Sequence, residues 1–382
     1  MSHYKVNAIP RVYDLKKLLK PNKVIAIFGP RRSGKTTLIK EYLKETPFRY
    51  RYDTGDNIAI HEVLESQNLD MLKEYVGDNE LIVIDEAHLI PNIGINLKIM
   101  VDNIPNIRII ITGSSSFDLA NQIGEPLVGR KFTYLLYPIS FFELKPLMSG
   151  FDIRQVLEKM LVYGSYPEVM STISKKARIQ TLSEITNSYL FKDILIFEGI
   201  KNSTTLLNLL RLIAFQIGAE VSLSELGNSL GIDKKTVARY LNLLEQTYII
   251  TPLHPYFTNQ RKSVIKKNKY YFLDLGVRNT IIGNFNSVSQ RNDLGALWEN
   301  FLVIERLKKQ AYKPIYANNY FWRTWEQNEI DWVEMRDGKL FGYEFKWSPK
   351  AKSKNKAVWL TAYPQEAVFE VINQDNYQDF VC

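Results

Sequence analysis

Residues 23–37 read KVIAIFGPRRSGKTT, and this stretch decides the fold of the first part of the chain. Its first six residues form a short, mostly β-branched apolar run typical of a buried strand, and a helix-like pattern follows the loop through residue 43. The loop between them has the spacing G-x-x-x-x-G-K-T, in which glycines let backbone N–H groups turn inward around phosphate oxygens. Strand, loop and helix therefore follow one another as a nucleotide-binding loop requires.

The residues of this loop are predicted to bind ATP together with magnesium. Lys35 is expected to reach the β- and γ-phosphates, and Thr36 is expected to bind the metal ion. The alternative, a glycine-rich turn without a ligand, does not account for the flanking strand and helix. The predicted nucleotide-binding residues are Gly29, Pro30, Arg31, Arg32, Ser33, Gly34, Lys35, Thr36 and Thr37.

Two further apolar strands are predicted to complete this site. Residues 81–84 run into Asp85, expected to hold a magnesium-bound water, and Glu86, expected to polarise the water that attacks the γ-phosphate. Two adjacent carboxylates predict hydrolysis as well as binding. Residues 108–111 run into Thr-Gly-Ser-Ser, where Ser114 is predicted to sense the γ-phosphate; an ordinary serine-rich turn is the alternative.

Residues 85–88, Asp-Glu-Ala-His, also match the box of one helicase class. Those helicases need a second lobe with an arginine motif, and nothing after residue 150 resembles one. We therefore do not favour a helicase.

Length and composition limit the class of protein. A chain of 382 residues exceeds one ordinary hydrophobic core, so we expect three domains. Hydrophobic residues at 45% and charged residues at 24% are typical of a folded protein. The sequence shows no membrane span and no signal peptide, and its single cysteine, Cys382, fits a reducing compartment, so we expect a cytoplasmic protein. The net charge of +8 permits a polyanionic partner.

A helix-turn-helix is predicted over residues 222–244. Ser222 and Asp233 stand where they cap the first and the second helix. The second helix buries Val237, Leu241 and Leu244 on one side, which leaves Lys234, Lys235 and Arg239 facing outward, as in a DNA-recognition helix.

Two β-rich segments, residues 248–250 and 269–273, follow and flank a basic loop. The loop contains Lys262, Lys266 and Lys267, a pattern typical of the wing of a winged helix. We expect contact with DNA phosphates, which salt weakens. A lid or a protein-contact module is the alternative.

Residues 328–347 contain Asp337-Gly338, the strongest short signal for a hairpin. With these two residues as the loop, Asp331 lies opposite Glu344, and Glu329 lies opposite Lys346 on the same face. The other face is predicted to join the core and carries Ile330, Trp332, Tyr343, Phe345 and Trp347. Opposed carboxylates destabilise a sheet unless a positive charge lies between them. A divalent cation would supply that charge, and Lys346 would supply it in part.

Nearly the whole chain resembles one prokaryotic protein family. The resemblance is carried by the nucleotide loop, the Asp-Glu-Ala strand, Thr-Gly-Ser-Ser, Gly129-Arg130 and residues 137–143, 163–168 and 192–195. The family is that of archaeal and bacterial AAA-type ATPases with a C-terminal restriction-endonuclease-like domain of uncertain role. Ser165 departs from its pattern, where a second glycine is expected. The resemblance implies that Arg130 is an arginine finger or sensor, and a homo-oligomer is required if it acts in trans; a surface arginine is the alternative.

The C-terminal hairpin resembles the core of PD-(D/E)xK nucleases. Glu299 then matches the helix glutamate of that fold, and the resemblance implies magnesium binding by Glu299, Asp331 and Glu344. Asp331, Glu344 and Lys346 would be the catalytic residues, with the lysine positioning or activating the attacking water. A degenerate nuclease fold kept for binding, or a charged ladder on a solvated face, is the alternative.

The predicted architecture is α/β throughout. Residues 1–195 form an AAA-type P-loop NTPase domain with a helical lid, residues 196–282 a winged helix-turn-helix, and residues 283–382 a restriction-endonuclease-like domain. The expected function is magnesium-dependent ATP hydrolysis coupled to DNA binding, with metal-dependent phosphodiester cleavage as a further activity. The alternative is a nucleotide-operated switch that binds a protein partner and cuts nothing.

Overall fold

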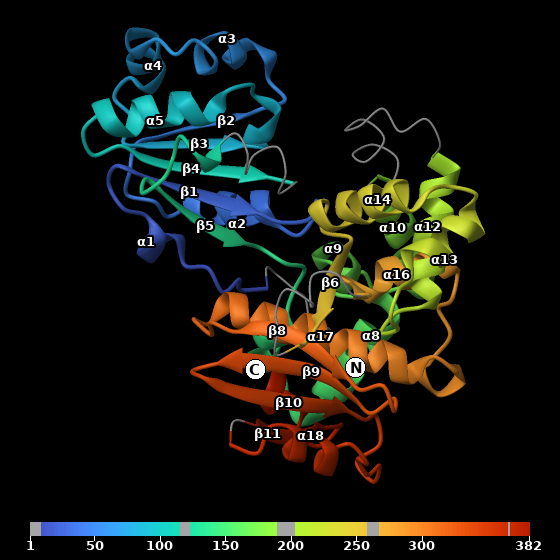
Figure 1. Ribbon diagram of the computed structural model, residues 1–382. Coiled ribbons are helices and arrows are strands. Elements are labelled where there is room, and N and C mark those ends of the chain that lie inside the picture. Colours follow the sequence, from blue (N-terminus) through green and yellow to red (C-terminus); the bar gives the residue numbers. More distant parts are fainter. Residues whose placement is uncertain (1–8, 115–122, 189–202, 258–266, 366) are drawn as a thin grey trace. The chain divides into compact units, whose positions relative to one another are not determined.

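The chain folds into two compact units. The computed structural model describes residues 9–114, 123–188, 203–257, 267–365 and 367–382 (Figure 1). The P-loop unit comprises residues 10–138 and 246–248, and the C-terminal unit comprises residues 139–245 and 249–382 together with Ile9. Neither of the boundaries predicted near residues 195 and 282 coincides with this division. The segment expected to form a helical lid on the P-loop domain belongs instead to the C-terminal unit.

The P-loop unit is built on a parallel sheet of five strands in the order β2-β3-β4-β1-β5. The strands are β1 (Lys23–Phe28), β2 (Tyr50–Thr54), β3 (Leu81–Asp85), β4 (Arg108–Gly113) and β5 (Lys131–Leu135). The α-helices are α1 (Leu15–Leu18), α2 (Lys35–Leu43), α3 (His61–Leu64), α4 (Leu69–Val76) and α5 (Ile93–Asn103).

The three central strands, β1, β3 and β4, are buried on both sides, which explains why they read as nearly continuous apolar runs. Val24 and Ala26 of β1 pack in a cluster with residues of α4 and α5. Ile25 and Ile27 point the other way and pack with residues of α1 and α2. Helices therefore cover both faces, and the loops at the carboxyl edge of the strands are left to form a site, as in other open α/β sheets.

The C-terminal unit combines a helical part with a second sheet. Its α-helices are α7 (Phe141–Leu144), α8 (Gly150–Tyr163), α9 (Pro167–Ser171), α10 (Lys175–Ser188), α12 (Ser203–Phe215), α13 (Leu223–Leu230), α14 (Lys234–Gln246), α16 (Leu275–Ile282), α17 (Leu294–Tyr312), α18 (Lys356–Ala362) and α19 (Tyr377–Val381). None of the helices in the described ranges is long and apolar enough to cross a membrane.

The second sheet contains six strands in the order β11-β10-β9-β8-β6-β7. They are β6 (Ile250–Pro255), β7 (Lys269–Phe272), β8 (Asn318–Arg323), β9 (Glu329–Arg336), β10 (Lys339–Phe345) and β11 (Ala367–Ile372). Residues of helix α17 pack on one face of this sheet, and Trp359 of α18 packs on the other. The hairpin β6–β7, expected to be the wing of a separate domain, is thus part of the same sheet as β9 and β10.

The predicted pair of helices around a tight turn is present as α13 and α14. Ser222 Oγ accepts the N–H of Glu225, and Asp233 Oδ1 accepts the N–H groups of Lys235 and Thr236, so both predicted caps are confirmed. The predicted apolar side of α14 is also buried. Strands β6 and β7 follow as an antiparallel pair.

The register of the C-terminal hairpin is confirmed where its ladder is formed. Arg336 pairs with Lys339, and the pairing continues to Trp332 and Tyr343. The turn residues Asp337 and Gly338 both have positive φ, as a two-residue hairpin loop requires.

The predicted faces of β9 are wrong at one end. Trp332, Tyr343 and Phe345 pack together on the α17 side, but Ile330 packs on the opposite side with Val333. The cause is an irregularity against β8, where Tyr320 pairs with Val333 while Trp322 pairs with Ile330. Two residues of β9 therefore oppose one residue of β8. This β-bulge reverses which face of the sheet each side chain points to in the part of β9 that precedes Trp332.

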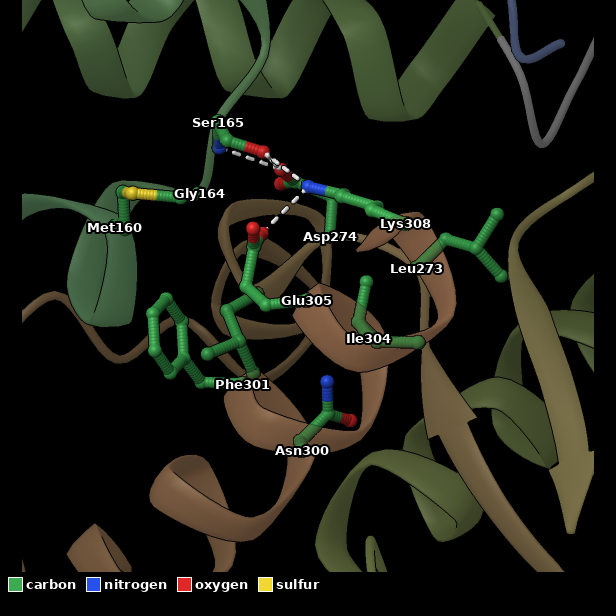
Figure 2. Close-up of a pocket in the computed structure, with 11 residues that line it drawn as sticks. Met160, Gly164, Ser165, Leu273, Asp274, Asn300, Phe301, Ile304, Glu305 and Lys308 are labelled. Carbon is green, nitrogen blue, oxygen red and sulfur yellow. Dashed lines mark hydrogen bonds and ion pairs between the residues drawn. The ribbon is translucent and has the colours of Figure 1, made fainter. Parts of the chain in front are cut away.

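A buried polar cluster joins distant segments of the C-terminal unit (Figure 2). Lys308 of α17 donates to Glu305 Oε1 at 2.7 Å and to Ser165 Oγ at 3.2 Å. Asp274 accepts the backbone N–H of Ser165 at 2.6 Å and that of Val277 at 3.1 Å. Ser165, which replaces an expected glycine, thus supplies a hydroxyl that helps to hold a buried ammonium group.

Gly164 must be glycine for two reasons, and its replacement tests this packing. Its φ of +71° and ψ of −160° lie in a region open to glycine only, and an added Cβ would lie 2.0 Å from Asp274 Oδ1. Asp274 cannot yield, because it is fixed by two backbone donors. We expect Gly164→Ala to destabilise the protein by at least about 3 kcal/mol in denaturant unfolding.

Gly150→Ala is the matched control, because Gly150 begins α8 and nothing lies within 4 Å of the place that an added Cβ would take there. It should leave stability unchanged or raise it by less than about 1 kcal/mol. Equal effects of the two substitutions would contradict the role given to Gly164.

Candidate functional site

The loop between β1 and α2 has the backbone of a phosphate-binding turn. Gly29 has a φ of +150°, and an added Cβ would lie 2.2 Å from the carbonyl oxygen of Leu136, so only glycine fits. Gly34 precedes α2 in the left-handed region, with a φ of +101°. The amino terminus of α2 consequently faces the loop, and the positive end of its helix dipole favours an anion there.

Lys35 lies buried inside this loop. Its ammonium group donates to the carbonyl oxygens of Gly29 at 2.9 Å and Pro30 at 3.0 Å. The hydroxyl oxygen of Ser33 is buried and has no hydrogen-bond partner among the described residues. A buried cation beside an unsatisfied hydroxyl fits a phosphate group, so the residues present agree with the predicted ligand.

Arg11, which sequence analysis did not single out, supports the loop. Its guanidinium group donates to the carbonyl oxygen of Ser33 and to that of Tyr137, both at 2.7 Å. It thereby ties the loop to the segment that follows β5. No local motif surrounds Arg11, so only the fold reveals this contact.

Asp85 brings together three hydroxyl groups at the carboxyl edge of the sheet. Thr36 Oγ1 donates to Asp85 Oδ2 at 2.7 Å, and the Tyr52 hydroxyl donates to the same oxygen at 3.1 Å. The Thr112 hydroxyl donates to Oδ1. The predicted magnesium ligands, Thr36 and Asp85, are therefore in direct contact. Their hydroxyl and carboxylate oxygens are the donor set that magnesium prefers.

Glu86 follows in a left-handed conformation with a φ of +49°. Its N–H donates to Thr112 Oγ1 at 2.8 Å, which fixes its backbone beside Asp85. Burial raises the pKa of the Glu86 carboxyl above its usual value, while the positive charge of Lys35 opposes this rise. A raised pKa makes this carboxylate a better proton acceptor, as the predicted role demands.

Ser114 contacts a histidine next to Glu86. Its Oγ lies 3.5 Å from His88 Nε2, and His88 Nδ1 lies 3.3 Å from Glu86 Oε2. Burial, with Arg31 as a secondary cause, lowers the pKa of His88 to about 4, so the imidazole is neutral at pH 7. Ser114 thus reaches Glu86 through His88, and Thr112 makes the direct contact with Asp85. Thr112 and His88 were missed as site residues, although both stand within the motifs that sequence analysis quoted.

Arg130 is not brought to the loop. It immediately precedes β5, whose first residue, Lys131, pairs with Val24 near the start of β1. It thus lies at the amino edge of the sheet, opposite the edge that carries the loop, and its Nε binds Asp102 Oδ1 at 2.5 Å. The structure therefore contradicts a sensor role within its own site. A role in a neighbouring subunit's site stays a prediction.

The nuclease-like residues form a charged cluster in the C-terminal unit. Lys346 Nζ lies 2.8 Å from Glu344 Oε1, and the Ser353 hydroxyl donates to Glu344 Oε2. Asp331 accepts the backbone N–H of Phe345 at 2.7 Å. Burial, with the charge of Glu299 as a secondary cause, raises the pKa of Asp331 to about 8.

The structure does not arrange Glu299, Asp331 and Glu344 as metal ligands. Among the residues that it describes, no group of three or more Asp, Glu, His or Cys side chains is placed to hold a metal ion. Glu299 instead pairs with the ammonium group of Lys269 at 3.1 Å. The magnesium site implied by the nuclease resemblance does not fit the side chains as they lie.

The predicted nucleic-acid contacts are only partly within the described residues. Lys234 and Lys235 are exposed in the first turn of α14, and Arg239 is exposed one turn further along. Lys267 is exposed just before β7. Lys262 and Lys266 lie outside the described residues.

Three family models match separate parts of the chain. Residues 21–145 match an AAA domain, residues 154–288 match a domain of unknown function (DUF8612), and residues 294–379 match another (DUF4143). The first match covers the sheet, the loop and both carboxylates described above. Over residues 21–145 the P-loop unit is therefore similar to AAA domains.

The relatives that the whole sequence resembles carry no assigned activity. An uncharacterized protein of Mycobacterium tuberculosis is 28% identical over 339 residues, which cover 87% of this chain and 72% of that protein. An uncharacterized protein of Methanocaldococcus jannaschii is 23% identical over 349 residues, covering 85% and 75%. Among solved structures, RuvB of Thermotoga maritima aligns with a TM-score of 0.32 at 15% identity, over 60% of this chain and 81% of that chain.

The high pKa of Asp331 predicts a characteristic dependence of stability on pH. The carboxyl has an ordinary pKa of 3.8 and a folded pKa of about 8. Its contribution to stability is thus fully present below pH 3.8 and is lost as pH rises through about 8. Asp331→Asn keeps an acceptor for the Phe345 N–H but does not titrate.

Scanning calorimetry gives the melting temperatures of wild type and Asp331→Asn. We expect the difference, wild type minus Asp331→Asn, to decrease as the pH rises from 5 to 9. The difference isolates Asp331 from other groups that titrate in this range. A difference that stays constant with pH would contradict the assignment.

Proposed function

We propose that this protein is a magnesium-dependent ATPase of the AAA type. The observation that carries the proposal is the contact between Thr36 and Asp85 at 2.7 Å, beside the buried ammonium group of Lys35 and the carboxylate of Glu86. A metal ligand pair, a phosphate-binding cation and a candidate base converge at one edge of the sheet. This set is what phosphoryl transfer to water requires.

Each residue has a defined task in this proposal. Lys35 and the loop N–H groups bind the β- and γ-phosphates, and Thr36 and Asp85 hold the magnesium ion. The ion supplies positive charge that offsets the charge on the phosphates. Glu86 orients the attacking water and accepts its proton, and the neutral His88 lies beside the Glu86 carboxylate, with Nδ1 3.3 Å from Oε2.

Glu86→Gln separates hydrolysis from binding. The amide keeps the size of the side chain but cannot accept the proton, so turnover should fall at least about 100-fold. ATP affinity should stay within about threefold, because the phosphate and metal ligands remain. The measurements are steady-state phosphate release and the binding of a fluorescent ATP analogue.

Glu62→Gln in α3 is the matched control, because Glu62 is an exposed carboxylate of the same unit. It should change neither turnover nor binding. If Glu86→Gln turned over ATP at the wild-type rate, Glu86 would have no place in the mechanism.

Coupling of ATP turnover to DNA binding is a second proposal. It is supported by α13 and α14, in which a buried apolar side leaves Lys234, Lys235 and Arg239 exposed. Such side chains bind DNA phosphates and give little sequence preference. The competing function is a nucleotide-operated switch that binds a protein partner through the winged helix and an inactive nuclease-like domain.

The double variant Lys234→Gln/Lys235→Gln distinguishes these functions. Loss of two phosphate contacts should weaken duplex binding at least about tenfold and reduce the slope of log affinity against log salt by about 2. Fluorescence anisotropy measures both quantities, and DNA should stimulate ATP turnover in wild type only.

Lys175→Gln/Lys176→Gln is the control, since these exposed lysines occupy the same positions in the first turn of α10. Equal DNA affinity of wild type and both variants, with turnover indifferent to DNA, would favour the protein-directed switch.

A further inference from the structure

Lys269 is a buried cation in the centre of the nuclease-like cluster. It begins β7, and its side chain is 1% exposed. Its ammonium group pairs with Glu299 of α17 at 3.1 Å and with Glu329, the first residue of β9. One lysine therefore bridges carboxylates from two elements that are about 30 residues apart in sequence.

Tyr271 reinforces this contact from the same strand. Residues two apart in a strand point to the same side, so Lys269 and Tyr271 face α17 together. The Tyr271 hydroxyl donates to Glu299 Oε1 at 2.6 Å, the oxygen that also binds Lys269. Strand β7 thus supplies both donors to Glu299.

The other carboxylates of the cluster also have donors. Glu329 lies 3.7 Å from Arg323 Nε, in addition to its pair with Lys269. Glu344 binds Lys346 and Ser353, and Asp331 binds the N–H of Phe345. A divalent metal needs several carboxylate oxygens directed at one open point. Here the oxygens are directed at protein donors.

Lys269 is paired with the carboxylates that surround it. Its side chain is 1% exposed, and Glu299 and Glu329 both form ion pairs with its ammonium group. A buried ammonium group without such partners would be expelled or neutralised. The cluster and the lysine therefore depend on each other.

We propose that the ammonium group of Lys269 is the resident cation of this acidic cluster, in the place that the nuclease resemblance gives to magnesium. The C-terminal unit then binds no divalent metal at Glu299 and Asp331, and it has no metal-dependent nuclease activity there. The cluster instead ties β7, and with it the β6–β7 hairpin, to α17 and β9. This inference does not rest on the proposed ATPase activity.

The test uses the full chain without nucleotide, in an Asp85→Asn background that removes the magnesium ligand of the P-loop. Lys269→Met keeps much of the side chain's bulk but leaves Glu299 and Glu329 without their cation. We expect its melting temperature to fall by about 10 °C. Addition of 5 mM Mn²⁺, roughly the range of weak protein sites, should restore at least half of this loss in Lys269→Met and should not shift the background protein.

Two controls assign the recovery to the cluster. Lys267→Met, at the exposed lysine two residues earlier, should neither lower the melting temperature nor create a response to Mn²⁺. Lys269→Met/Asp331→Asn should lose the response, because one of the candidate metal ligands is gone. Lys269→Arg keeps a positive charge and should stay insensitive to Mn²⁺.

Calorimetric titration of the background protein with Mn²⁺ tests the proposal even if Lys269→Met fails to fold. No binding that depends on Asp331 is expected. Binding of one ion that Asp331→Asn abolishes would overturn the proposal, because Lys269 would then not exclude the metal. A folded Lys269→Met without any response to Mn²⁺ would also overturn it, since the ammonium would not stand in a metal's place.

Discussion

The carboxylate of Asp85 is the contact on which the P-loop site depends. It ends β3, a strand buried on both sides, and its two oxygens accept hydrogen bonds from Thr36, Tyr52 and Thr112. These hydroxyls come from α2, β2 and β4, so one side chain connects the loop to the strands on either side of β3. Thr112 also accepts the N–H of Glu86, which extends the same network to the candidate base. The hydrogen bonds of Asp85 and Thr112, which belong to central strands of the sheet, therefore position the other residues of the site.

The two carboxylate clusters of this protein differ in the kind of donor that surrounds them. Asp85 is bound by neutral hydroxyl groups, which orient the carboxylate but leave its negative charge to attract a metal ion. Glu299 is bound by a hydroxyl group and an ammonium group, and the ammonium cancels its charge. Opposite charges in contact within a protein interior attract far more strongly than in water, so a metal would have to displace a well-held lysine. Donor charge, more than the count of carboxylates, separates a metal site from an ion-pair cluster.

Sequence analysis succeeded where the determining residues are neighbours in the chain. The loop, the caps at Ser222 and Asp233, and the hairpin at Asp337-Gly338 each follow from short spacings, and each is found in the structure. The register between β9 and β10 is confirmed as far as Trp332. The predicted face of Ile330 was wrong, because the bulge is produced by pairing with β8, which no local pattern in β9 encodes. Sequence analysis left open whether Arg130 acts in its own subunit's site. The parallel pairing of β5 with β1, which no local pattern encodes, places Arg130 at the amino edge of the sheet, away from the loop.

The role of Lys269 was beyond sequence analysis because it depends on the order of strands in the second sheet. Sequence analysis divided the chain before residue 283 and assigned the lysine to a wing and Glu299 to a nuclease-like domain. In the structure, β6 pairs with β8, so the hairpin that carries Lys269 joins the sheet that carries Glu329. The proposed DNA-binding helices and the acidic cluster consequently belong to one compact unit. The ion pairs of Lys269 with Glu299 and Glu329 therefore hold the β6–β7 hairpin within the same unit that contains α14.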